Sequence, residues 1–119
     1  MHLSASKTVI FATRSLLILL ITFALIVTVT TPVYAASFVV TKTADTDDNT
    51  CNADCSLREA ITAANNNPGA DSITFAPGAN GTITLSSNLP SINGTLTING
   101  NGLANTIISG NDLYRGFEV

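Results

Sequence analysis

Short aliphatic stretches recur at near-constant spacing through the second half of this chain, and no other feature constrains its fold as strongly. Ile73 lies 23 residues before Leu96, which lies 21 residues before Phe117. Turns rich in Asn and Gly separate the stretches, which occupy residues 72–75, 82–85, 95–98, 106–109 and 116–119. Self-similarity at a period of about 20–50 residues is typical of a solenoid, in which successive repeats stack on one another.

The length of the repeat suits a coil with three sides. Strands of about five residues joined by loops of about two to five residues use roughly 20–25 residues per turn. In the stretch Thr82-Ile83-Thr84, strand alternation sends the Ile inward and the Thr residues outward. The sequence therefore predicts a mainly β chain of stacked parallel strands. Because Asn-Gly pairs also mark hairpins, an antiparallel meander or sandwich is the alternative.

The N-terminus has the order of a secretory signal peptide. Lys7 and Arg14 precede an apolar run of 14 residues (16–29), and the small residues Val33 and Ala35 follow it. The run is shorter than the roughly 18–20 residues that span a bilayer. We expect a helical signal peptide over residues 1–35, cleavage after Ala35, and a secreted or cell-surface location. An uncleaved N-terminal membrane anchor is the alternative, and in either case only this segment meets the membrane.

Charge excludes several classes of function. Residues 36–119 contain three basic and eight acidic side chains, so the sequence predicts no nucleic-acid partner. The single histidine is His2, inside the signal segment. The exported part therefore has no Ser-His-Asp set and no His-based metal site. We expect no enzymatic activity and no cofactor.

The two cysteines, Cys51 and Cys55, both lie in the exported part. In an oxidising compartment we expect them to form a disulfide that closes a short loop. Free thiols are the alternative, since a tetrahedral zinc site needs four N or S ligands and no further Cys or His is present.

A short helix is predicted after the second cysteine. Ser56 and Glu59 have the spacing of a capping box, in which each side chain bonds the backbone N–H of the other residue. Arg58 lies between them, as the partner of a nearby carboxylate or as an exposed charge. Apolar residues follow at the spacing of one helix face: Leu57, Ala60, Ile61 and Ala64. A first strand over 37–43 is expected before the helix, and the run 65–69 ends the helix.

The acidic loop before the helix, residues 44–54, offers weak calcium ligands. Asp45, Asp47 and Asn49 stand at the first, third and fifth positions of an EF-hand loop. The sixth position is Thr50 rather than Gly, and the twelfth is Ser56 rather than Glu. The sequence therefore favours a solvated loop without metal, and calcium binding is the alternative.

The segment 38–75 resembles the CSLREA domain over about a third of the chain. It contains the signature Cys-Ser-Leu-Arg-Glu-Ala-Ile at 55–61, followed by matching residues at 63–65, 68–71 and 73–75. The resemblance implies the N-terminal domain of an exported bacterial protein whose remainder is a right-handed parallel β-helix, similar to the pectin-lyase fold. The family offers no established catalytic residues to transfer to these positions.

These observations predict a three-part organisation. Residues 1–35 are the signal peptide, 36–70 form a CSLREA-type cap of strand, disulfide loop and short helix, and 71–119 form the first coils of the β-helix. The cap would cover the open end of the coil with the helix face of Leu57, Ile61 and Ala64. Because the sequence stops within an apparent strand at Val119, we expect a fragment of a longer chain.

The predicted function is that of an exported, non-catalytic cap region of a β-helix surface or adhesin-like protein. Its expected partners are the remaining coils of a longer parent chain, and an extracellular polysaccharide or a host or cell surface. The alternative is the N-terminal part of a pectin-lyase-like enzyme that degrades polysaccharides. The outward strand positions are mainly Thr and Ser, without the clustered acidic and basic side chains of a catalytic face, which favours the first hypothesis.

Overall fold

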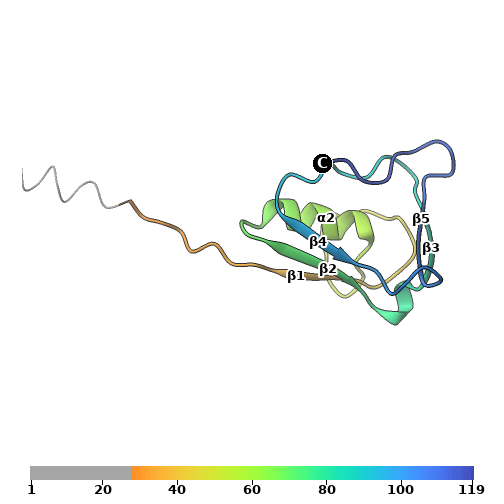
Figure 1. Cartoon of the computed structure of the whole chain (residues 1–119), viewed down its shortest axis with the longest axis horizontal. Helices are drawn as coiled ribbons and strands as arrows, with labels where there is room; N and C mark the ends of the chain where they lie inside the picture. Colours follow the sequence, from red (N-terminus) through yellow and green to blue (C-terminus); the bar gives the residue numbers. More distant parts are fainter. Residues whose placement is uncertain (1–27) are drawn as a thin grey trace, which may run out of the picture. The chain divides into compact units, whose positions relative to one another are not determined.

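A computed structural model describes residues 28–119 (Figure 1). The chain divides into two compact units, 1–32 and 33–119, and the second contains every helix and strand described below. The predicted signal helix falls largely on residues 1–27, outside the described part. Ala35, the predicted cleavage site, is exposed and lies in a segment without regular structure. Within residues 28–119, no helix is long and apolar enough to cross a bilayer.

The first three elements form a β-α-β unit. Strand β1 (Ser37–Val40) is followed by the acidic loop, helix α2 (Leu57–Asn66) and strand β2 (Asp71–Phe75). β1 and β2 pair in parallel, with Ser37 opposite Ser72. A parallel pair needs a long crossover connection, and the loop with α2 supplies it.

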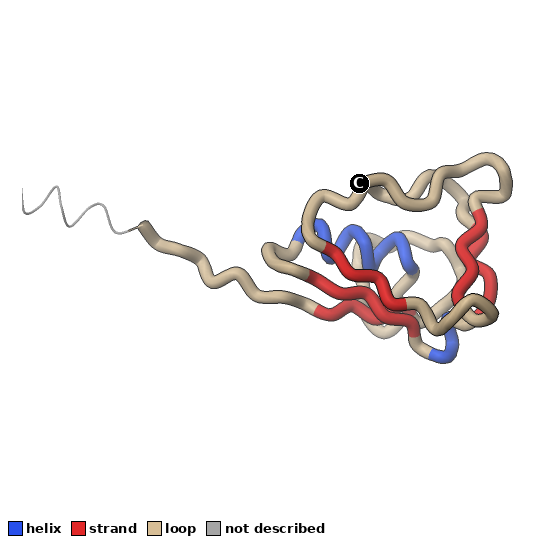
Figure 2. Tube along the Cα trace, viewed as in Figure 1, coloured by secondary structure: helices blue, strands red, loops and turns tan. Residues whose placement is uncertain are grey.

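The remaining strands alternate between two sheets. The short 3-10 helix η1 (Pro77–Ala79) lies at the turn that leads from β2 to β3 (Gly81–Thr84), and β4 (Leu96–Asn99) and β5 (Thr106–Ser109) follow. One sheet has the order β1-β2-β4 and the other consists of β3 and β5, all in parallel. Figure 2 shows that the two sheets run in different directions on either side of η1.

The core lies between α2 and the inner faces of the strands. Ile83 is buried while its neighbours Thr82 and Thr84 are exposed, as strand alternation predicts. The helix contributes Leu57, Ala60 and Ile61 to the same cluster, and the other members come from the strands and loops: Val40, Cys55, Ile73, Phe75, Ala79, Ile83, Leu85 and Leu89.

The predicted right-handed parallel β-helix is wrong. The strands form two small separate sheets, of three and two strands, rather than a coil closed on three sides. The segments 85–95 and 110–119 lie where a third side would be needed, and they contain no strand. Two isolated backbone bonds join them, from the N–H of Leu89 to Arg115 O and from the N–H of Ile92 to Glu118 O. Pro90 lies between these donors and has no N–H, so the ladder cannot become continuous.

The strand expected at 116–119 is absent for a related reason. Asn111 and Asp112 have φ angles of 52° and 58°, in the left-handed region, so the chain turns sharply after β5. Residues 115–119 then have no regular structure, and Phe117 and Val119 remain exposed.

The predicted helical cap is also wrong. α2 contacts β1 and β2 and shares its buried side chains with the main core, rather than lying across an open end. Burial extends beyond the apolar stripe to Arg58 and Glu59, which are 7% and 2% exposed. A lid on the end of a coil would present such charged side chains to water, whereas here the acidic loop and the segment after β3 cover them.

Candidate functional site

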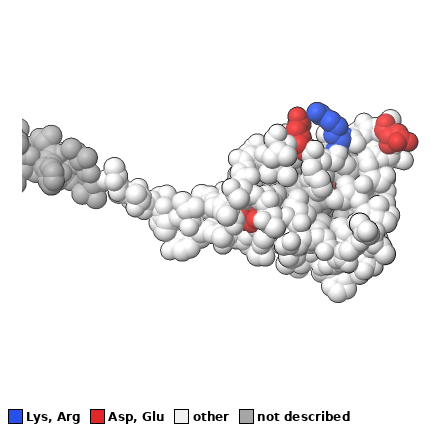
Figure 3. Space-filling model, in the orientation of Figure 1, with Lys and Arg blue, Asp and Glu red and all other residues white. Residues whose placement is uncertain are grey.

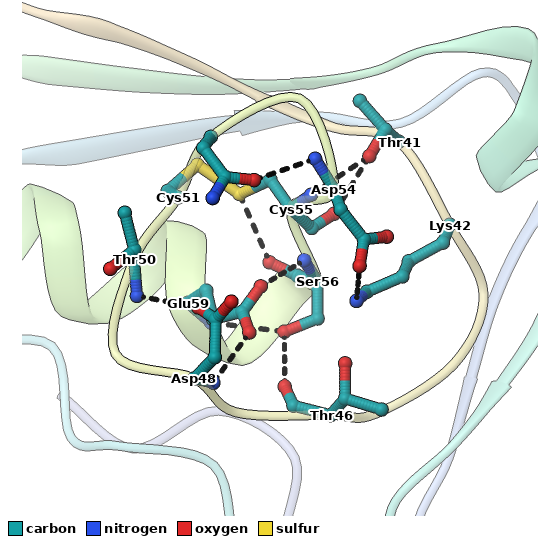
Figure 4. The surroundings of a disulfide bond; sticks show 11 residues. Thr41, Lys42, Thr46, Asp48, Thr50, Cys51, Asp54, Cys55, Ser56 and Glu59 are labelled. Atoms are coloured by element: carbon teal, nitrogen blue, oxygen red, sulfur yellow. Dashed lines mark hydrogen bonds and ion pairs between the residues drawn. A yellow bond between two sulfur atoms is a disulfide. The ribbon is translucent and has the colours of Figure 1, made fainter.

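The acidic loop is fastened to the start of α2 by a disulfide and by backbone bonds. Cys51 and Cys55 are joined, with their Cα atoms 4.5 Å apart (Figure 4). The Thr41 N–H donates to Cys55 O at 2.9 Å, and the Cys55 N–H donates to the Thr41 hydroxyl oxygen at 2.9 Å. Lys42 forms an ion pair with Asp54 at 3.0 Å across the mouth of the same loop.

The capping box lies at the residues where the sequence places it. The Ser56 N–H donates to Glu59 Oε2 at 2.7 Å, and the Glu59 N–H donates to Ser56 Oγ at 3.2 Å. Ser56 Oγ donates in turn to Thr46 O at 2.6 Å, while Glu59 Oε1 accepts the N–H of Asp48 at 2.9 Å (Figure 4). Each group of the box therefore also holds the acidic loop against the helix.

These bonds alter the acidity of the buried carboxyl group. Burial raises the pKa of Glu59, but the N–H groups of Ser56 and Asp48 stabilise the ionised form more strongly. The pKa of Glu59 therefore lies below its ordinary value. Glu59 is held as an anion for structural reasons, because its two oxygens are already occupied by backbone donors.

Arg58, the residue before Glu59, joins the helix to the acidic loop and to the segment after β3. Its Nε and Nη2 donate to the two carboxylate oxygens of Asp45 at 3.1 and 2.7 Å. The same guanidinium donates to Asn88 O at 2.7 Å and to Ser87 O at 3.0 Å. The side chains of Arg58 and Asp45 are only 9% and 2% exposed, so this is a buried, bidentate ion pair.

Asp45 is bound from two directions. The N–H and the hydroxyl of Ser86 donate to Asp45 Oδ2 at 2.8 and 2.9 Å. Burial raises the pKa of Asp45, but the bonds from Arg58 and Ser86 outweigh that effect, so its pKa lies below the ordinary value. The pair links the acidic loop, the helix and the segment after β3.

The weak calcium candidates are not assembled into a site. Asp45 faces Arg58, whereas Asp47 Oδ1 accepts the N–H of Asn49 at 3.0 Å in a local turn. Asp48 Oδ1 accepts the N–H of Thr50 at 2.9 Å in the same manner. Within residues 28–119, no group of three His, Cys, Asp or Glu side chains could hold a metal ion.

A pocket of about 260 Å³ opens at the other end of α2. The last turn of the helix, the loop before β2 and the start of β4 enclose it. Its lining combines amide side chains with one carboxylate and a small apolar patch: Ala64, Asn65, Asn67, Pro68, Gly69, Asp71, Asn93, Gly94, Thr95 and Leu96. No basic side chain is among them.

Asp71 is the buried charge of this pocket, with 3% of its surface exposed. Its Oδ1 accepts the backbone N–H of Ala36 and the Asn67 amide N–H, both at 2.8 Å. Its Oδ2 has no hydrogen-bond partner among the described residues. Because no fully buried polar side-chain atom among these residues lacks a partner, Oδ2 keeps contact with solvent. Asp71 is also one of the residues that line the pocket.

Sequence reasoning missed Asp71 and Asp45 as structural anions. Asp45 was expected to face solvent or calcium, and its partner Arg58 lies 13 residues away. Asp71 could have been suspected from its position, because a charged residue that begins a buried strand needs a partner.

The chain matches no family model, no curated protein and no solved structure. The resemblance to the CSLREA domain therefore depends on its motif alone.

Proposed function

We propose that this chain is an exported, non-catalytic structural module of a cell-surface protein. One observation carries the proposal: the disulfide between Cys51 and Cys55 stabilises the start of α2 in a domain whose buried charges bind only its own loops. Disulfides persist in exported proteins and are rare in reducing compartments.

The use of the buried charges supports a structural role. Catalytic acids and bases need an accessible proton and a substrate within reach. Both Glu59 oxygens accept backbone N–H groups, and both Asp45 oxygens accept from Arg58. These carboxylates therefore serve to stabilise the fold. In the pocket at the other end of α2, Asp71 is the one charged residue of the lining.

To test export, the full chain is expressed in a bacterium with a tag at its C-terminus. Cell fractionation locates the product, and mass spectrometry of the intact protein gives its N-terminus and its redox state. The proposal predicts a product outside the cytoplasm that begins at Ala36 and is two hydrogens lighter than its reduced form. Leu19→Arg, in the apolar run, should abolish export, whereas Ala35→Leu should permit export and block cleavage. A cytoplasmic product with two reactive thiols would contradict the proposal.

The absence of catalysis is tested on the same purified product. Polygalacturonate, alginate and neutral glycans are incubated with it, and new reducing ends and unsaturated products are measured. The proposal predicts no products above a control from cells that express the Leu19→Arg variant. Sustained turnover by the purified chain would instead support a polysaccharide-degrading enzyme.

A further inference from the structure

The segment just after the predicted cleavage site is bound to the buried carboxylate of the pocket. The backbone nitrogen of Ala36 donates to Asp71 Oδ1 at 2.8 Å, and the N–H of Ser72 donates to Ala36 O at 2.9 Å. Ala36 is thus fixed next to Asp71 by its own nitrogen and carbonyl. In the uncleaved chain this nitrogen is a neutral amide with a single hydrogen.

Cleavage changes the chemistry of that nitrogen. Hydrolysis of the peptide bond between Ala35 and Ala36 consumes one water, leaves a carboxylate on Ala35 and frees the α-amino group of Ala36. An α-amino group has an ordinary pKa of about 7.7–8.0, so at neutral pH it takes up a proton and becomes an ammonium with three N–H donors. The new charge then lies at hydrogen-bond distance from Asp71.

We propose that the pocket end of the domain is a binding site for the α-ammonium of Ala36, which signal cleavage creates and which pairs with the carboxylate of Asp71. This inference rests on the proposed export and cleavage after Ala35. One ammonium hydrogen takes the present bond to Oδ1, and a second can reach Oδ2, which has no partner among the described residues.

The surroundings of Asp71 supply no competing charge. β1, β4 and the last turn of α2 contain no charged residue, and neither do the flanking loops 67–70 and 93–95. The carboxyl end of a helix carries partial negative charge, which also favours a cation there. Figure 3 shows how few charged side chains this face of the molecule carries overall.

The bonds that cleavage removes are few. The Asn67 amide donates to Tyr34 O at 2.8 Å and to Asp71 Oδ1 at 2.8 Å. Only the first of these is lost with the signal segment, so Asn67 continues to hold Asp71. Maturation therefore removes one neutral bond at an exposed tyrosine carbonyl and turns the existing bond from Ala36 to Asp71 into an ion pair in which donor and acceptor are both charged.

The test uses the processed protein purified from exporting cells, with its N-terminus established by mass. The amines of Ala36 and Lys42 are labelled with cyanate, and the rate of carbamylation at Ala36 is measured with Lys42 as the internal reference. These rates are compared in the wild type, in Asp71→Asn and in Asp112→Asn. The inference predicts a rate for the Ala36 amine at least tenfold lower in the wild type and in Asp112→Asn than in Asp71→Asn. Equal rates in all three proteins would overturn it.

A second measurement needs no variant at position 71. If Asp71 holds the ammonium, the pKa of the Ala36 amine is higher in the folded state than in the unfolded chain. Stability from the pair is then complete below about pH 7.7 and is lost as the pH rises through the folded-state pKa. We expect the Tm of the processed protein to fall between pH 8 and 10, and full carbamylation of Ala36 to remove this decrease. A Tm that is flat over this range, or a decrease that carbamylation leaves unchanged, contradicts the pairing.

These outcomes are separate from the proposed function. A product that begins at Ala36 but shows no protected amine would overturn the pairing and leave export intact. A product that begins elsewhere would refute cleavage after Ala35 and the pairing together.

Discussion

At the scale of residues, the domain depends on buried polar groups whose partners cannot be predicted from its composition. The capping box was predictable because Ser56 and Glu59 are three positions apart and the motif is local. The bond from Arg58 to Asp45 spans 13 residues, and those to the carbonyls of Ser87 and Asn88 span 29 and 30. No local pattern encodes such contacts, which follow from the way the loops fold over α2.

Removing the Arg58 side chain should lower the free energy of unfolding of the domain substantially. Arg58→Met leaves the Asp45 carboxylate buried without its counter-charge, and breaking a buried pair in this way costs about 3–5 kcal/mol. Urea unfolding followed by circular dichroism measures the loss. The control is Arg115→Ala, which removes an exposed pair with Glu118 and should cost less than about 1 kcal/mol. Equal effects of the two substitutions would show that the Arg58 pair is not buried in solution.

Acid should weaken the domain through the same groups. The pKa values of Asp45 and Glu59 are lowered in the folded state, so the unfolded chain binds protons first as the pH falls. Their stabilisation is complete above the ordinary carboxyl pKa values of about 3.9–4.3 and is lost as the pH drops through the folded-state values.

We expect the free energy of unfolding to fall progressively below about pH 5. Glu59→Gln should be less stable at pH 7 but should show a shallower decrease with acid, as measured by urea titrations at pH 7, 5, 4 and 3. Asp112→Asn, at an exposed site, is the matched control and should follow the wild type. An unchanged acid slope in Glu59→Gln would remove Glu59 from this mechanism.

At the scale of elements, the positions of the strands were encoded far better than their assembly. β5 occupies Thr106–Ser109, as the aliphatic stretch predicts, and β2, β3 and β4 begin within one residue of the expected positions. The predicted fold class was wrong because the pattern of aliphatic and turn residues does not show where the backbone hydrogen bonds between neighbouring strands are interrupted. Here Pro90 and the left-handed pair Asn111 and Asp112 prevent the third side from forming strands.

Gly69, in the connection between α2 and β2, should not tolerate a side chain. Its φ is 147°, which side chains rarely adopt, and in the uncleaved chain an added Cβ would lie 2.6 Å from Tyr34 O. Gly69→Ala should therefore lower the free energy of unfolding by at least about 1 kcal/mol. Gly94→Ala is the matched control on the other wall of the pocket, since an added Cβ meets nothing within 4 Å there. Chemical denaturation of both variants is the measurement, and a tolerated Gly69→Ala would contradict the backbone conformation described.

At the scale of the whole molecule, residues 33–119 form one compact unit in which two interleaved parallel sheets share a core with α2. The sequence predicted that the helix would cover the open end of a coil with its apolar face. In the structure α2 packs against β1 and β2, and the loops supply the bonds that allow the charged side chains of Arg58 and Glu59 to be buried. The proposed structural role and the proposed Ala36 ammonium site both depend on this arrangement.

The arrangement is tested most directly by nuclear Overhauser contacts in the isotope-labelled protein. We expect contacts typical of parallel neighbours between β2 and β4, with Ser72 opposite Thr97, and between β3 and β5, with Thr82 opposite Ile107. We also expect contacts between the methyl groups of Ile61 and Ile73, which share the core. Close Hα–Hα contacts between antiparallel neighbouring strands, together with a solvent-exposed Ile61, would contradict it.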